Sequence, residues 1–330
     1  MTVLVTGGAG YIGSHMVWRL VDAGESVVVL DRLSTGFEWA VAPEAKLVVG
    51  EVGDEALVER LIGEHGVDAI IHFAGSIVVP ESVADPLGYY QNNTVQSRAL
   101  IAAAIRSGVK HFIFSSTAAV YGDAGTRPVV ETAATAPLSP YGRSKLMTEW
   151  MLDDAARAHD FRFAALRYFN VAGADPRGRT GQSTRGATHL IKVACETALG
   201  KRDRIEILGT DYETPDGTCV RDYIHVSDLA NAHADALAYL RAGGASLIAN
   251  CGYGHGYSVR EVVDAVLRVS GVPFKVVEGP RRAGDVPAVV ADATIARERF
   301  GWRPEHDDLD ECVSTALAWE KALSLRNRRD

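Results

Sequence analysis

The chain has 330 residues, of which 47% are hydrophobic and 23% charged, and this ordinary globular composition excludes fibrous and intrinsically disordered classes. Its 42 acidic residues outnumber its 34 basic ones and give a formal charge of −8, which argues against a nucleic-acid-binding protein. The four cysteines lie far apart without a CxxC pair, no leader-like segment opens the chain and no apolar run approaches about 20 residues, so we expect a cytoplasmic protein without bound metal or membrane contact.

Short apolar runs alternate with amphipathic segments through the first half of the chain. The runs occupy residues 2–6, 26–31, 46–50, 67–74, 110–115 and 161–169, and the amphipathic segments occupy 11–23, 55–64, 86–107 and 140–159. Strands that alternate with helices predict βαβ units and a parallel sheet. Because the runs are continuous, they indicate strands that are covered on both faces. We therefore expect an α/β fold with a doubly wound parallel (Rossmann) sheet.

The regular alternation ends after residue 170. A segment rich in Gly, Arg and Thr follows at 175–186, and later segments mix short strands with helices at 187–199, 227–240 and 258–269. We expect residues 1–170 to form the Rossmann domain, with a return segment at about 218–242. Residues 171–217 and 243–330 are expected to form a smaller, interleaved C-terminal lobe that binds the substrate.

The first predicted strand runs directly into a glycine-rich turn, Thr6-Gly7-Gly8-Ala9-Gly10-Tyr11-Ile12-Gly13. A turn without Cβ atoms lets a pyrophosphate approach the backbone, and the following helix N-terminus supplies free N–H groups. Asp31 stands 18 residues after Gly13, at the end of the second strand, where an acid bonds both ribose hydroxyls and repels a 2′-phosphate. This context predicts NAD binding rather than NADP binding, although the neighbouring Arg32 is able to receive a 2′-phosphate.

Tyr141 and Lys145 lie four residues apart after Pro140, so they share one face of a predicted helix. A free tyrosine has a pKa of about 10, and a neighbouring ammonium group lowers that pKa by favouring the phenolate. The pair can then take a proton from a sugar hydroxyl while a hydride leaves the same carbon. Thr117, which follows the strand at 110–115, can hydrogen-bond the reacting oxygen. A YxxxK pair alone is common on helices, but here it follows the glycine turn and the Ser-Ser-Thr strand end in the expected order.

At these residues the chain resembles the extended short-chain dehydrogenase/reductase family, and most closely its UDP-hexose 4-epimerases. The resemblance covers nearly the whole chain, and its specific segments are 6–15, 89–93, 114–122, 139–145, 167–170, 220–226 and 281–287. It implies an isomerase of galactose and nucleotide-sugar metabolism that interconverts UDP-galactose and UDP-glucose. In that NAD-dependent reaction C4 is inverted through a transient 4-keto sugar. Tyr141 would be the base, Thr117 its helper, and Lys145 would also reach the nicotinamide ribose.

The resemblance also implies which residues contact the cofactor and the UDP-sugar. NAD would be held by Gly7, Gly10, Tyr11, Ile12, Gly13, Asp31, Glu51, Val52, Phe73, Ala74, Gly75, Asn93, Ser115, Tyr141, Lys145 and Tyr168. The substrate would contact Thr117, Tyr141, Phe169, Asn170, His189, Leu190, Arg221, Arg282, Asp285 and Val289. The two arginines match positions that hold the diphosphate, and a planar guanidinium suits that role. Taken singly, either arginine is equally consistent with a surface ion pair.

Several positions depart from the family pattern and leave the identity of the sugar open. Glu51 stands where an Asp is usual near the adenine, Ile77 where a lysine is usual, and His189 where an Asn often contacts the nucleotide. Val289 replaces a bulky Tyr beside the second carbon of the sugar, which leaves volume for an N-acetyl group. A UDP-N-acetylglucosamine or UDP-uronate 4-epimerase is therefore the alternative substrate assignment.

The same residues can be compared with the requirements of two other classes of function. Sugar-nucleotide dehydratases of this fold need an acid pair after the Thr of the Ser-Ser-Thr strand, but Ala118 and Ala119 occupy those positions. A non-catalytic, NAD-sensing binding protein would not require the intact set of Thr117, Tyr141 and Lys145. The predicted helices at 86–107 and 140–159 resemble the family's dimer-forming pair, so we expect a homodimer.

Overall fold

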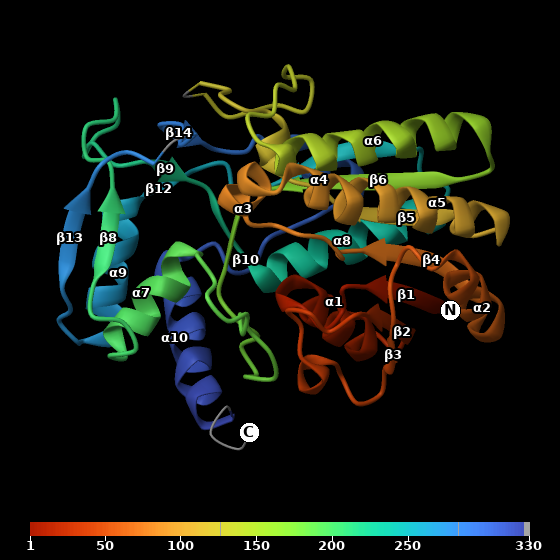
Figure 1. Ribbon diagram of the computed structural model, residues 1–330, viewed down its shortest axis with the longest axis horizontal. Coiled ribbons are helices and arrows are strands. Elements are labelled where there is room, and N and C mark those ends of the chain that lie inside the picture. The colour runs from red at the N-terminus through yellow and green to blue at the C-terminus, as the bar shows by residue number, and fades with distance from the viewer. Residues whose placement is uncertain (126, 283, 327–330) are drawn as a thin grey trace.

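A seven-stranded parallel sheet forms the centre of the first part of the molecule (Figure 1), and the computed structural model describes residues 1–125, 127–282 and 284–326. The strand order is β11-β6-β5-β4-β1-β2-β3. The strands are β1 (Thr2–Thr6), β2 (Ser26–Asp31), β3 (Lys46–Val49), β4 (Val67–His72), β5 (His111–Ser115), β6 (Arg162–Tyr168) and β11 (Leu247–Cys251). The order reverses between β1 and β4, and ligands bind at such a switch point. The predicted doubly wound sheet is confirmed.

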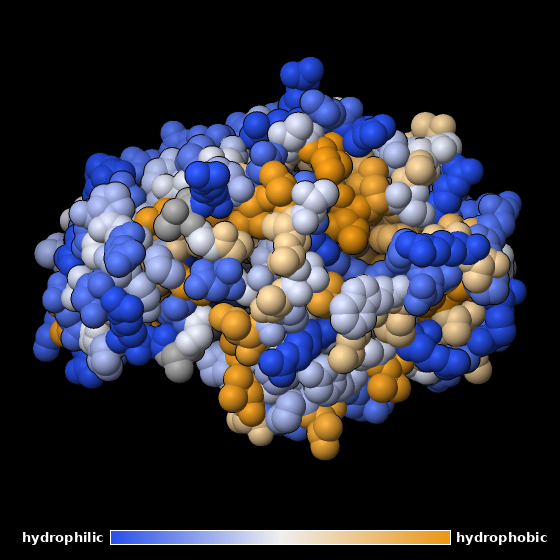
Figure 2. Space-filling view, turned by 90° about the horizontal axis from the view of Figure 1, so that it is seen from above, coloured by the Kyte–Doolittle hydropathy of each residue, from blue (hydrophilic) through white to orange (hydrophobic). Residues whose placement is uncertain are grey.

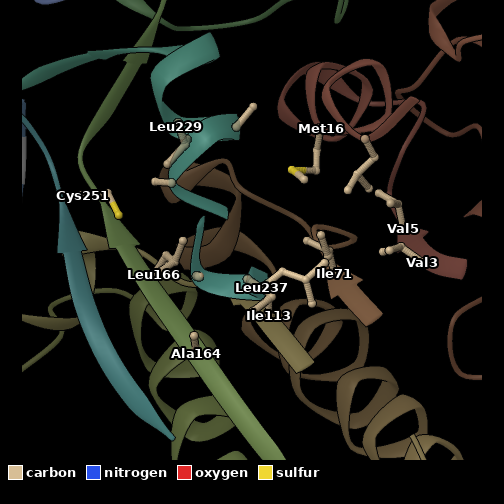
Figure 3. Close-up of a cluster of buried hydrophobic side chains, with 14 of the residues drawn as sticks. Val3, Val5, Met16, Ile71, Ile113, Ala164, Leu166, Leu229, Leu237 and Cys251 are labelled. Carbon is tan, nitrogen blue, oxygen red and sulfur yellow. The ribbon is translucent and has the colours of Figure 1, made fainter. Parts of the chain in front are cut away.

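Helices cover both faces of this sheet. α1 (Tyr11–Asp22) and α8 (Val226–Arg241) pack on one face, while α2 (Glu55–His65), α5 (Gln96–Arg106) and α6 (Pro140–Ala158) pack on the other. Figure 3 shows the first of these cores, in which Val3 and Val5 of β1 face Met16 of α1. Leu4 points to the opposite face and joins the second core, as the two-residue period of a strand requires.

The segment expected as one helix over 86–107 is divided. It consists of α4 (Pro86–Tyr89), a wide π-helical turn η2 (Tyr90–Val95) and then α5, with α3 (Val79–Ala84) before them. The wide turn carries Asn93, whose buried side chain donates to Ser144 of α6 over 3.0 Å. A π-turn inside a helix often occurs at a functional site, because it redirects one side chain without breaking the helix.

The C-terminal part forms a third core that is smaller than the first two. α7 (Leu190–Ala198), α9 (Val259–Ser270) and α10 (Leu309–Arg326) surround it. Short strands complete this part: β7 (Asn170–Ala172) pairs with β10 (Tyr223–His225), β8 (Ile205–Leu208) with β13 (Val276–Gly279), and β9 (Val220–Arg221) with both β12 (Tyr257–Ser258) and β14 (Ala288–Val289). Three short helical turns are η1 (Glu38–Ala40), η3 (Ala118–Val120) and η4 (Ala296–Phe300).

The chain returns to the first sheet over a longer stretch than the expected 218–242. β11 pairs in parallel with β6 and becomes the seventh strand, although its residues were expected in the substrate lobe. Trp302 is also buried in the core under α8, and its indole Nε1 donates to the carbonyl of Asp228 over 3.0 Å. The expected boundary is wrong here because β11 is short and its pairing partner lies about 80 residues earlier in the chain. None of the helices in the described ranges combines the length and apolar character needed to cross a bilayer.

Candidate active site

β1 delivers the glycine-rich turn to the N-terminus of α1, at the carboxyl edge of the sheet. Gly7 has a left-handed φ of 70°, and a Cβ there would lie 2.6 Å from the Ala74 nitrogen. A Cβ on Gly13 would lie 2.1 Å from the carbonyl oxygen of Gly7. Gly10 is the N-cap of α1, and no described side chain caps the first turn, which also holds no acid. The N–H groups of that turn therefore stay available for an anion such as a pyrophosphate.

Asp31 ends β2 and joins the glycine turn to the loop that follows. Its Oδ2 accepts from the Ala9 N–H over 3.0 Å, and its Oδ1 accepts from the Leu33 N–H over 2.8 Å. Arg32 points to Glu51, with 3.6 Å between Nη1 and Oε1. The carboxylate of Glu51 therefore partly neutralises the guanidinium of Arg32, which agrees with the preference for NAD.

The loop after β4 carries Phe73, Ala74 and Gly75, and Asn93 ties this loop to α6. The Oδ1 of Asn93 accepts from the Ser76 N–H over 2.7 Å, while its Nδ2 donates to the Ser76 carbonyl. A Cβ on Gly75 would lie 3.1 Å from Asn93 Oδ1 and 3.7 Å from the Lys145 Nζ. Three segments that are far apart in the sequence therefore meet at Gly75.

Tyr141, Lys145 and Thr117 come together at the carboxyl end of β5, as the sequence predicts. Tyr141 and Lys145 lie in the first turns of α6, which begins after the N-cap Ser139, and both side chains are buried. The Lys145 Nζ donates to the carbonyl of Ser115 over 2.9 Å. Tyr168 lies on the neighbouring strand β6, and its hydroxyl is 2.7 Å from the Ser115 Oγ.

Burial is the main influence on the pKa values of Tyr141 and Lys145. It raises the pKa of Tyr141, and a hydrogen bond with Thr117 offsets only part of that rise. Burial also lowers the pKa of Lys145 to about 8, against the attraction of Glu149. The expectation that the ammonium group holds the pKa of Tyr141 below its ordinary value is therefore wrong for the protein without ligands. The physical reason is that desolvation penalises the phenolate more than its neighbours stabilise it.

The residues expected at the UDP-sugar lie mainly on the C-terminal lobe. Arg221 of β9 and Arg282 both face Asp285, with Nη2 to Oδ1 distances of 3.8 and 2.8 Å. Val289 of β14 lies beside Arg221 in the parallel pairing of β14 with β9. Two guanidinium groups therefore face one carboxylate here, and both form ion pairs with it.

Other expected contacts surround the junction between the sheet and the lobe. The Tyr11 hydroxyl donates to the Gly173 carbonyl over 2.6 Å, so its side chain points to the lobe and only its backbone faces the glycine turn. His189 is the N-cap residue of α7, and burial lowers its pKa. The other predicted residues have these positions: Ile12 is the second residue of α1, Val52 lies in the loop after β3, Phe169 follows β6, Asn170 begins β7, and Leu190 begins α7.

One buried acid was absent from the sequence expectations. Glu149 lies one turn beyond Lys145 on α6 and pairs with Arg167 of β6, and both side chains are buried. Its spacing of four residues from Lys145 was the available signal.

Among the described residues, no group of three or more His, Cys, Asp or Glu is arranged to hold a metal ion. A cleft of about 570 Å³, lined in part by Arg32, Ser76 and Asn92, opens beside the Asp31 loop.

Comparisons with known proteins agree with this geometry. The NAD dependent epimerase/dehydratase family matches residues 3–252. The chain is 58% identical over 321 residues to a UDP-glucose 4-epimerase of Azospirillum brasilense, covering 97% of this chain and 92% of that one. It is 44% identical to a Brucella ovis UDP-glucose 4-epimerase solved in complex with NAD, with a TM-score of 0.93 and coverage of 96% and 97%. A UDP-Glc/GlcNAc 4-epimerase of Campylobacter jejuni is 48% identical, with a TM-score of 0.85 and coverage of 97% and 99%.

Proposed function

Because the chain belongs to the NAD dependent epimerase/dehydratase family, we propose that it inverts C4 of a UDP-hexose and so interconverts UDP-galactose and UDP-glucose. The observation that carries this proposal is the buried group of Tyr141, Lys145 and Thr117 at the carboxyl edge of a doubly wound sheet. Catalytic groups of open α/β sheets lie at this edge. The glycine turn stands at the same edge, so a dinucleotide bound there would lie against a sugar at Tyr141.

NAD is the cofactor, and the described residues fit it. The uncapped N–H groups after Gly10 would receive the pyrophosphate, and Asp31 would bond the adenosine ribose. The loop at Gly75, together with Asn93, would line the nicotinamide half next to Lys145. Bound NAD supplies a reversible hydride acceptor for C4.

Side chains of the protein then transfer one proton from the substrate and back to it. Tyr141 takes the proton of the 4-hydroxyl as C4 is oxidised and returns it after the keto sugar has turned its other face. Thr117 hydrogen-bonds the same oxygen, and Lys145 stabilises the phenolate electrostatically. Since burial raises the pKa of Tyr141, proton removal would depend on these stabilising partners, and bound NAD would add the positive charge of its nicotinamide.

A second substrate is favoured by one specific position. Val289 is a small side chain on β14, beside Arg221, where the diphosphate would bind. A smaller residue leaves room for an N-acetyl group on the second carbon of the sugar, and the relative from Campylobacter jejuni is named for both sugars. We infer that UDP-N-acetylglucosamine is also epimerised, with UDP-glucose as the primary sugar.

A homodimer is the assembly that the surface supports. Exposed hydrophobic side chains gather on α3, the turn of α4 and η2, and α6: these are Val79, Val83, Leu87, Val95 and Trp150. Leu87 is 78% exposed and Trp150 is 57% exposed, which is unfavourable in water unless a partner covers them. Figure 2 shows that hydrophobic residues interrupt the charged surface on the face seen from above. Two copies of this helical face would form a four-helix contact.

The four described cysteines, Cys195, Cys219, Cys251 and Cys312, are buried free thiols. Thiols of this kind suit the reducing cytoplasm. We place the enzyme there, in galactose metabolism, because UDP-galactose and UDP-glucose are its proposed substrate pair.

The direct test offers UDP-galactose to the purified protein without added NAD and measures UDP-glucose. We expect turnover, together with NAD that is released when the protein is denatured. Tyr141→Phe should lower kcat by roughly 10³-fold because general acid–base catalysis contributes on that order. Tyr239→Phe, which changes a phenol that packs on Phe300 away from the site, is the matched control. Bound NAD without turnover on any UDP-sugar would instead favour the nucleotide-sensing alternative.

A further inference from the structure

Glu149 is a fully enclosed carboxylate beside the proposed catalytic group. Its Oε1 accepts from the Ser116 Oγ over 2.5 Å and from the Arg167 Nε over 2.9 Å, and its Oε2 accepts from the Arg167 Nη2 over 2.5 Å. It is 2% exposed, and a carboxylate buried to this extent is stable only when both of its oxygens are paired. Ser116 and Arg167 satisfy that requirement.

The contact with Ser116 continues a pattern along α6. Lys145 donates to the carbonyl of Ser115, and Glu149, one helical turn further on, accepts from the hydroxyl of Ser116. Residues four apart share one helical face, so two adjacent residues of the strand end are held by two adjacent turns of one helix. Thr117 is the next residue along this strand end, and its Oγ1 accepts from the Ala119 N–H over 3.1 Å.

The charges around Lys145 also single out Glu149. The titratable groups that face this region are Tyr141 and Glu149 on α6, His72 on β4, Arg167 and Tyr168 on β6, and Tyr121 and Glu131, which both act on Arg167. Burial lowers the pKa of His72 to about 3 and raises the pKa of Tyr168, so both are neutral near pH 7. Glu131 acts on Arg167, whereas Glu149 is the carboxylate that attracts Lys145 and also pairs with Arg167.

We propose that Glu149 is a positioning residue for the epimerase reaction: through Ser116 it fixes the strand end that carries Thr117, and its charge keeps Lys145 an ammonium. Without Glu149, Lys145 and Arg167 would be two cations in one buried region, and the site would shed a proton from Lys145. Arg167 cancels the charge of Glu149, so the pair leaves Lys145 as the net charge of the site. This proposal rests on the roles proposed above for Tyr141 and Lys145.

The test compares kcat and KM for UDP-galactose across pH in the NAD-loaded wild type and in Glu149→Gln. Glutamine retains an acceptor for Ser116 and Arg167 but removes the charge. We expect kcat at neutral pH to fall about tenfold with KM changed less than about twofold. The alkaline limb of the kcat profile should move about one pH unit lower, because Lys145 then loses its proton earlier as the pH rises. A uniform loss at every pH with the limb in place would overturn the electrostatic role.

The double variant Glu149→Gln/Arg167→Met removes both charges and separates charge from packing. Its alkaline limb should return to within about 0.3 pH units of the wild type, because the second cation is gone. A limb that stays displaced in this variant would contradict the proposal. Bound NAD and thermal unfolding, measured on every variant, identify any variant that does not fold.

Ser116→Ala keeps both charges and tests the strand-end contact, even if Glu149→Gln does not fold. We expect kcat to fall about tenfold with the alkaline limb unmoved, since one buried hydrogen bond to a charged group is lost. Wild-type kcat in this variant would overturn the positioning role. These outcomes are distinct from failure of the proposed function, in which the wild type itself would not turn over UDP-galactose.

Discussion

The pKa of a single residue, Lys145, predicts how the rate of the reaction depends on pH. Burial lowers its pKa to about 8, so its ammonium form is present below that pH and is lost as the pH rises through it. Because the cation is proposed to stabilise the phenolate of Tyr141, kcat/KM should fall on the alkaline side near pH 8. Measuring kcat/KM from about pH 6 to 10 checks this, since that ratio reports the free holoenzyme. Activity that stays level through this range would show that Lys145 is not needed as a cation.

Val289 makes the choice of sugar a testable property of one side chain. Val289→Tyr would fill the space that we propose for the N-acetyl group at the second carbon, so kcat/KM for UDP-N-acetylglucosamine should fall roughly 100-fold. The value for UDP-galactose should stay within about threefold, because no bulky group is present at that carbon. Val272→Tyr, at an exposed position after α9, is the control. Equal losses for both sugars would mean that this position does not select between them.

At the scale of elements, α10 reaches back to the loop that follows β2. Trp319 of α10 lies 5.9 Å from Trp39 between ring centroids, and Trp39 stacks on Phe37 at 5.1 Å. The Phe37 N–H donates to the Ala9 carbonyl over 3.0 Å, inside the glycine turn. α10 therefore supports the loop beside the proposed adenosine site.

Trp319→Ala should consequently lower the free energy of unfolding by about 3–5 kcal/mol, the usual effect of truncating a buried tryptophan. NAD should also dissociate faster, because the loop from Asp31 to Phe37 loses its support. Chemical denaturation and the NAD content after dialysis measure the two effects. Val272→Ala, which shortens an exposed side chain, should change stability by less than about 0.5 kcal/mol. A destabilised Trp319→Ala protein that retains NAD as tightly as the wild type would rule out the link between α10 and the cofactor.

At the scale of the whole molecule, the exposed hydrophobic face of α3, α4, η2 and α6 predicts self-association. Val83→Glu and Leu87→Glu together should convert a dimer to a monomer, because each would bury a charge in an apolar contact. Light scattering after size-exclusion chromatography measures the mass. Val49→Glu, on the edge strand β3, alters an equally exposed side chain away from this face. A wild-type protein that is monomeric at micromolar concentration would contradict the proposed dimer.

The parallel sheet, the glycine turn and the common face of Tyr141 and Lys145 were all predictable before folding was considered. Each depends on local rules: continuous apolar runs form buried strands, glycines permit a tight turn, and residues four apart share a helical face. The carboxyl ends of parallel strands meet at one edge, so Asp31 and Thr117 could also be assigned to the same site.

Other features arise only when distant segments pack. β11 joins β6, Glu149 meets Arg167, Asp285 lies between two arginines, and the Tyr11 hydroxyl reaches Gly173. The protonation of Tyr141 belongs with them, because desolvation depends on everything that surrounds the phenol. Spacing along a chain contains no record of burial or of pairing between separate elements. The residues for the proposed chemistry can therefore be recognised in the sequence. The protonation and pairing of the charged groups around them, in contrast, are set by the packed interior.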